Sequence, residues 1–150
     1  MDNTGQSSFQ EVQAPLQKIY SRRAIYGGTF LGGPIACGYL FASNFNAFDE
    51  PAKAKKAWAI TAVATMVIFG IAFLLPPKFP PYILPVIYCT LASVLVQKYQ
   101  GGQILQHLNN GGTTYGFWRT FGIGIAGLAI TLLLLFLIGF SLALAGVNVD

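Results

Sequence analysis

Few side chains of this 150-residue sequence have the type and spacing that acid–base, nucleophilic or metal chemistry requires. The single histidine, His107, has no acidic residue near it in the sequence, and a lone imidazole makes neither a metal site nor an acid–base pair. The two cysteines, Cys37 and Cys89, lack basic neighbours that would stabilise a thiolate. We therefore expect a non-enzymatic protein with no catalytic residue, no cofactor and no bound metal.

The positions of the five acidic residues indicate structural and not catalytic roles. Asp49 and Glu50 directly precede Pro51, and acidic residues followed by a proline are typical of a helix start. The other three lie near the ends of the chain: Asp2, Glu11 and Asp150.

Membrane transport would require polar or ionisable groups inside apolar segments, where such groups are costly and usually functional. This sequence offers only hydroxyls there, and a hydroxyl in a helix commonly bonds a carbonyl of its own helix. A coupled pump is therefore not indicated, whereas a pore built from several copies stays open as an alternative. The hydroxyl-bearing residues are Thr61, Thr65, Thr90, Ser93 and Thr131.

The composition indicates which elements hold these residues. Hydrophobic residues make up 54% of the chain and charged residues 9%, against roughly a quarter charged in soluble domains. Uncharged hydrophobic segments cover about 24–45, 57–75, 80–97 and 121–145, and about 20 such residues span a hydrocarbon core as a helix. We expect an all-α, multi-pass integral membrane protein with three transmembrane helices after a first segment that is broken by glycine and proline.

The domain organisation follows from the same pattern. Residues 1–23 are predicted to form a polar N-terminal arm, and residues 24–150 a single membrane domain. Between two glycine pairs, Ile104, Leu105 and Leu108 fall at helical spacing, which predicts a short interfacial helix over about 103–110.

The first segment contains the run GGTFLGGPIACG, from Gly27 to Gly38. Pro34 cannot donate to a helix and clashes with the carbonyl of Phe30, while Gly32 and Gly33 tolerate a sharp turn. A single helix over 24–48 would be about 37 Å long, whereas a chain folded at the glycines would make two arms of roughly 15 Å. The sequence leaves two interpretations open: a re-entrant hairpin and a kinked helix.

The positions of the nine basic residues favour the hairpin. If all four segments crossed the membrane, four basic residues would lie on one side and five on the other, so neither orientation would be favoured. If the first segment turns back, eight lie inside and Lys78 alone outside, which predicts a cytoplasmic N-terminus. The expected interfacial anchors are Arg22, Arg23, Lys55, Lys56, Trp58, Trp118 and Arg119.

The net charge of +4 does not indicate nucleic-acid binding, because the basic residues flank hydrophobic segments instead of forming one stripe. The expected partner is the lipid bilayer, and no nucleic acid is expected. The expected location is a bacterial plasma membrane.

Small residues four positions apart predict close helix packing, since they let backbones approach one another in lipid. Such packing within the chain is one interpretation and self-association the other. We expect a homo-oligomer or a larger membrane-protein partner, and a packing or assembly subunit as the function, the alternative being an oligomeric channel or membrane-permeabilising effector. The packing and turn residues are Gly28, Gly32, Gly33, Pro34, Ala36, Gly122, Ala126, Gly139 and Ala143.

The stretch from Tyr20 to Phe48 resembles the opening of an uncharacterised group of small bacterial multi-helix membrane proteins. The resemblance implies that the Gly-Gly-Pro turn is a shared structural unit, and it brings no activity, ligand or catalytic residue. The matching features are Tyr20-Ser21, the run TFLGGP from Thr29 to Pro34, the small residues from Ala36 to Gly38, and Asn44-Phe45.

Overall fold

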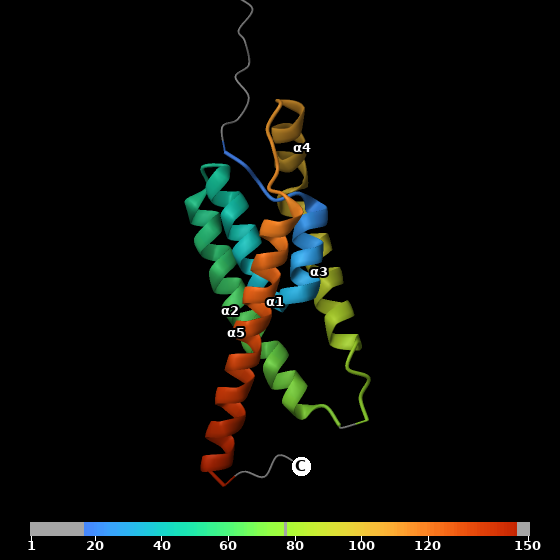
Figure 1. Cartoon of the computed structure of the whole chain (residues 1–150), viewed down its shortest axis with the longest axis vertical. Coiled ribbons are helices and arrows are strands. Elements are labelled where there is room, and N and C mark those ends of the chain that lie inside the picture. Colours follow the sequence, from blue (N-terminus) through green and yellow to red (C-terminus); the bar gives the residue numbers. More distant parts are fainter. Residues whose placement is uncertain (1–16, 77, 147–150) are drawn as a thin grey trace, which may run out of the picture.

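A computed structural model describes residues 17–76 and 78–146, and this part of the chain is helical apart from its connections. The only β-type pairing in it is an isolated parallel bridge between Ile19 and Thr114. The expected all-α class is therefore confirmed. The five helices are α1 (Arg22–Ala47), α2 (Pro51–Leu74), α3 (Ile83–Tyr99), α4 (Gly101–Asn109) and α5 (Phe117–Leu144) (Figure 1).

Helix α1 is a helical hairpin. Gly33 has φ 67° and ψ −160° and is followed by Pro34, so the helix is interrupted there, as the sequence predicted. The Tyr20 amide donates to Asn44 Oδ1 at 2.7 Å, although a continuous helix would separate these residues by about 36 Å. The two arms of α1 therefore run antiparallel, and of the two interpretations the turned chain is the one present (Figure 1).

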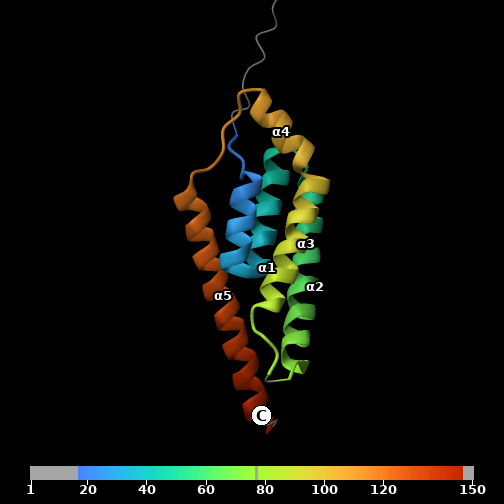
Figure 2. The ribbon, with the colours of Figure 1, turned by 90° about the vertical axis from the view of Figure 1, so that its right-hand side faces the viewer.

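The hairpin is the centre of the molecule. Helices α2, α3 and α5 all pack against α1, while these three outer helices make few contacts with one another. Figures 1 and 2 show the two short arms of α1 enclosed between the longer helices. The hydrophobic core consists mainly of hairpin residues and the segment that leads into the hairpin, with Ala54, Val96 and Ile104 of α2, α3 and α4 packed on them. Its fully buried members are Ile19, Tyr20, Ile25 and Leu40.

Both ends of α1, the starts of α2 and α5, and the end of α3 lie at one end of the bundle (Figure 1). The turn between α2 and α3, with Lys78, lies at the other end. We call the first of these the basic end, because it holds the other eight basic residues: Lys18, Arg22, Arg23, Lys53, Lys55, Lys56, Lys98 and Arg119.

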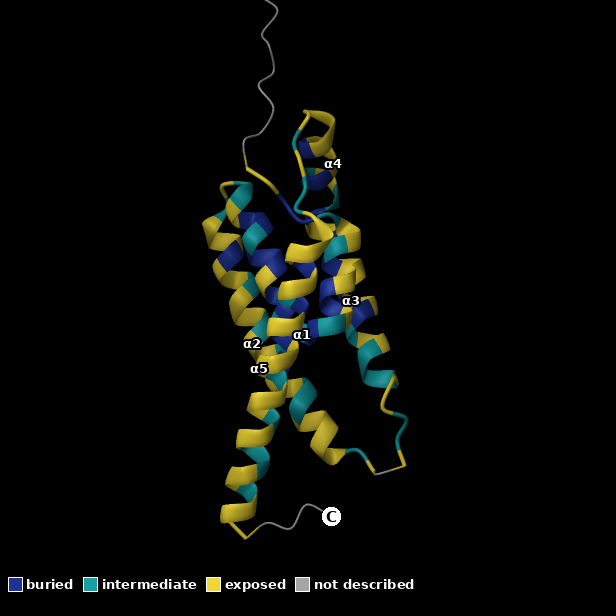
Figure 3. Cartoon of the chain, in the orientation of Figure 1, coloured by how far each residue is buried: buried dark blue, intermediate teal, exposed yellow. Residues whose placement is uncertain are grey.

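Two helices in the described part of the chain, α2 and α5, are long and apolar enough to cross a membrane. Helix α3 is apolar but has only 17 residues, so the expected third crossing is not established by length and composition. Away from the basic end the outer helices are exposed: no residue of α2 after Thr65 and none of α5 after Gly127 is buried (Figure 3).

Helix α4 follows α3 directly and extends beyond the bundle at the basic end (Figure 2). Its inner face carries Ile104 and His107, both buried, while Leu105 and Leu108 are exposed. Of the three apolar residues noted in the sequence, only Ile104 therefore faces the protein.

Candidate functional site

The arms of the hairpin are specified by local sequence signals. Ser21 caps the first arm, since its hydroxyl accepts a hydrogen bond from the Ala24 amide at 3.2 Å. The backbone of Gly33 lies in a region of φ and ψ that only glycine adopts readily, and Pro34 cannot continue the helical hydrogen bonding. The chain therefore turns at this position.

The tip of the hairpin is covered by α5. A Cβ atom on Gly32 would lie 2.5 Å from the carbonyl oxygen of Gly124, and one on Gly127 would lie 2.8 Å from the carbonyl oxygen of Gly32. Beside them, a Cβ on Gly33 would lie 3.9 Å from Thr131 Oγ1. Backbone against backbone contact of this kind is possible only between glycines, and it covers the irregular turn with protein.

The small residues predicted in α1 do pack within the chain. A Cβ on Gly28 would meet Leu40 Cδ1 at 2.6 Å, and Ala36 is 2% exposed. At Gly38 there is likewise no room for a side chain, because Thr61 of α2 lies directly against it. The hairpin therefore contacts both α2 and α5 at very short range.

The small residues predicted in α5 have no packing partner within the described part of the chain. Nothing lies within 4 Å of a Cβ built on Gly122 or on Gly139, and Ala126 and Ala143 are exposed. The residues that contact the hairpin are instead Gly124 and Gly127. They are three positions apart, so the pattern of small residues spaced four apart did not include them.

A buried polar cluster holds the open end of the hairpin together, and we call it the polar clamp. Oδ1 of the Asn44 side chain accepts a hydrogen bond from the backbone amide of Tyr20 at 2.7 Å. Nδ2 of the same side chain donates to the Tyr20 carbonyl at 2.9 Å and to Gln100 Oε1 at 3.3 Å. Gln100 Nε2 donates to the carbonyl of Phe41 at 2.9 Å. Asn44 and Gln100 are fully buried, so the clamp joins the two ends of α1 to the α3–α4 junction.

An aromatic and guanidinium stack lies next to the clamp. Arg119 Nε donates to the Tyr20 hydroxyl at 3.0 Å, and its guanidinium lies 4.1 Å from the ring centre of Tyr115. The ring centres of Tyr20 and Tyr115 are 4.6 Å apart. Burial raises the pKa of the Tyr20 phenol, while the hydrogen bond from Arg119 acts in the opposite direction. Arg119 therefore ties the start of α5 to the segment before α1.

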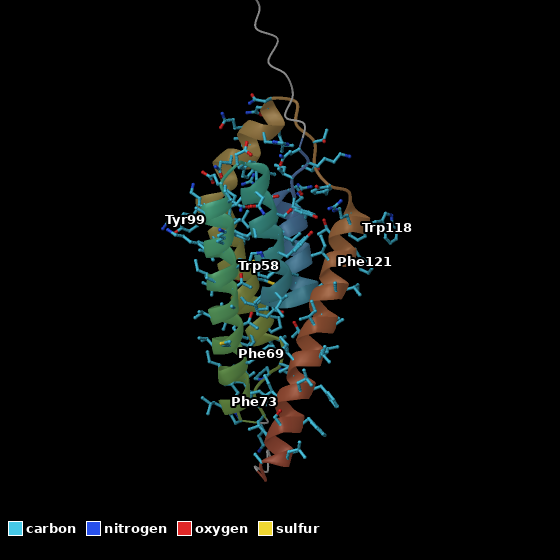
Figure 4. All side chains as sticks on the ribbon, turned by 90° about the vertical axis from the view of Figure 1, so that its left-hand side faces the viewer. Trp58, Phe69, Phe73, Tyr99, Trp118 and Phe121 are labelled. Atoms are coloured by element: carbon cyan, nitrogen blue, oxygen red, sulfur yellow. The ribbon has the colours of Figure 1, made fainter. Side chains whose placement is uncertain are left out.

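The other predicted anchors lie on the outside of the basic end. Trp118 is 80% exposed and Trp58 45% exposed. Figure 4 shows Tyr99 and Trp118 pointing outward from opposite sides of the bundle at a similar height. The remaining predicted anchors, all exposed, are Arg22, Arg23, Lys55 and Lys56.

A groove of about 430 Å³ opens between α2 and α3 because these helices do not pack closely against each other. Its floor is the second arm of α1. Lys53 and Lys56 lie at the basic end of the groove, and Lys53 pairs with Glu50 at 2.6 Å. The apolar lining residues are Cys37, Gly38, Phe41, Phe45, Ala57, Ile60 and Leu95.

Three of the five hydroxyls that a transport path could use donate to carbonyls of their own helices. Thr65 donates to the carbonyl of Thr61 at 2.8 Å, Thr131 to Gly127 at 2.8 Å and Thr90 to Val86 at 2.7 Å. His107 packs against the Phe48 ring. In residues 17–76 and 78–146 no group of three or more His, Cys, Asp or Glu side chains is arranged to hold a metal ion.

No protein-family model, curated protein or solved structure matches this chain.

Proposed function

We propose that this chain is a non-enzymatic integral membrane protein that acts as a self-associating or assembly subunit, with its basic end in the bacterial cytoplasm. The observation that carries the membrane placement is the folded first segment. Because α1 turns back at Gly33, eight basic residues share one end of an apolar bundle and Lys78 alone lies at the other, which is the asymmetry of the positive-inside rule.

In this arrangement α2, α3 and α5 cross the bilayer and the hairpin enters it without crossing. The tip of the hairpin lies beside Thr131, and about 20 Å of α5 continues beyond that residue. Helix α3 is about 25 Å long and is preceded by the prolines of the α2–α3 turn. It therefore reaches most of the way across a hydrocarbon core of about 30 Å.

Self-association is supported by surfaces that the chain leaves open. Gly122 and Ala126 form an outward strip of small residues on α5, and nothing in the described part of the chain lies within 4 Å of a Cβ built on Gly122. A second membrane helix can approach such a strip closely. The channel alternative has less support, because three of the five hydroxyls, those of Thr65, Thr90 and Thr131, are already bonded within their own helices.

Cross-linking in membranes tests the subunit proposal. We expect the wild-type chain to give dimers or larger species, and Gly122→Ile together with Ala126→Ile to reduce them strongly while the monomer stays folded, since both positions are open. Gly70→Ile in α2 is the matched control, because Gly70 is equally open. A wild-type chain that stays monomeric over a wide range of expression would contradict the proposal.

A further inference from the structure

The groove between α2 and α3 combines two features that differ along its length. Its floor and walls are apolar, and include the rings of Phe41 and Phe45 on the second arm of α1. Its basic end carries Lys53 and Lys56 on α2, with Tyr99 of α3 on the facing side. The groove thus presents positive charge at the level of the other basic residues and apolar surface toward the middle of the bundle.

We propose that this groove binds one anionic phospholipid, with the phosphate at Lys56 and Lys53 and an acyl chain along the floor formed by the hairpin. The inference rests on the proposed membrane placement. Basic pockets between transmembrane helices on the cytoplasmic side are suited to anionic headgroups. The apolar lining next to the lysines favours a lipid over a free phosphate, which would leave that surface without a partner.

The two lysines contribute unequally. Lys53 is engaged by the Glu50 carboxylate at 2.6 Å, whereas no ion pair involves Lys56 within the described residues. Lys56 is one turn further along the same face of α2, next to Ala57 in the lining. The phosphate therefore interacts mainly with Lys56, and Lys53 is the secondary contact.

Lys55 provides a matched control. It lies on the same helix at nearly the same height and is exposed, but it does not line the groove. General attraction of anionic lipid to the basic end would involve Lys55 as much as Lys56. A specific site would not.

The test uses the purified full-length chain with either phosphatidylglycerol or phosphatidylcholine of identical acyl chains, and retained lipid is counted by native mass spectrometry. We expect retention of one phosphatidylglycerol in preference to phosphatidylcholine. Lys56→Gln should weaken this retention about fivefold, as expected for one lysine at an anionic headgroup. Lys53→Gln should weaken it less, and Lys55→Gln should leave it unchanged.

Ala57→Phe fills the groove without removing charge and should also reduce retention, with circular dichroism checking that the helices persist. Glycerol 3-phosphate should not compete, because it lacks an acyl chain. Equal retention of both lipids, an equal effect of Lys55→Gln and Lys56→Gln, full retention by a folded Ala57→Phe variant, or competition by glycerol 3-phosphate would each overturn the proposal. Extraction of cell membranes with alkaline carbonate tests the membrane placement separately. A wrong membrane placement can therefore be distinguished from a wrong lipid site.

Discussion

Asn44 and Tyr20 are 24 positions apart in the sequence, yet the Asn44 side chain bonds both the amide and the carbonyl of Tyr20, at 2.7 and 2.9 Å. A side-chain amide that satisfies both backbone groups of one residue acts as a short piece of β-pairing. It fixes the position of the chain entering the hairpin relative to the chain leaving it. The hairpin is therefore held at its open end by hydrogen bonds and at its tip by glycine contacts with α5.

Replacement of Asn44 by alanine should destabilise the protein strongly. The amide and carbonyl of Tyr20 are buried and would both lose their partner, at roughly 1–3 kcal/mol for each group. We expect a clear fall in the thermal unfolding midpoint of the purified protein in detergent. Asn46→Ala is the control, because Asn46 is exposed on the same arm. Equal effects of the two substitutions would show that the clamp does not hold the hairpin.

Replacing Gly33 and Gly27 by alanine should have opposite effects on the stability of the protein. A Cβ at Gly33 has enough space, but a φ of 67° with ψ −160° is strained for alanine by about 1–3 kcal/mol. Gly27 lies within the first arm with nothing within 4 Å, so alanine there should stabilise by roughly 0.5–1 kcal/mol through helix propensity. Thermal unfolding midpoints of the two variants measure this: the midpoint should fall for Gly33→Ala and rise for Gly27→Ala. A Gly33→Ala variant with an unchanged midpoint would mean that the turn adopts another conformation.

The sequence predicted the break in the first segment, because a proline after two glycines interrupts a regular helix and because the basic residues gather on one side of the membrane only if the chain turns back. It did not predict the polar clamp. Asn44 and Gln100 lie in different segments, and their pairing depends on how the arms meet. For the same reason the contacts of Gly124 and Gly127 were missed: spacing along one helix does not tell which face its partner covers.

The membrane orientation can be tested with cysteine labelling. With Cys37 and Cys89 replaced by alanine, a cysteine at Asn46 should not react with a membrane-impermeant maleimide in intact cells, because Asn46 lies in the last turn of the returning arm of α1, at the basic end. A cysteine at Lys78 should react, because that exposed residue lies at the opposite end of the bundle. Both should react once the cells are lysed. Labelling of position 46 from outside would contradict the cytoplasmic placement.

Glu50 should make the start of α2 sensitive to acid. The hydrogen bond that Lys53 donates to the Glu50 carboxylate at 2.6 Å lowers the pKa of Glu50. A carboxyl group with a lowered pKa stabilises the fold above its unfolded value of about 4.3, and this stabilisation is lost as the pH falls through the folded pKa. The thermal midpoint of the wild type should therefore fall more steeply below about pH 4.3 than that of Glu50→Gln, and the two should converge in acid. Asp49→Asn is the matched control, and it should keep the wild-type dependence because no such partner holds Asp49 within the described residues. If Glu50→Gln and the wild type give parallel curves from neutral pH to pH 3, the ion pair of Glu50 with Lys53 does not stabilise the fold.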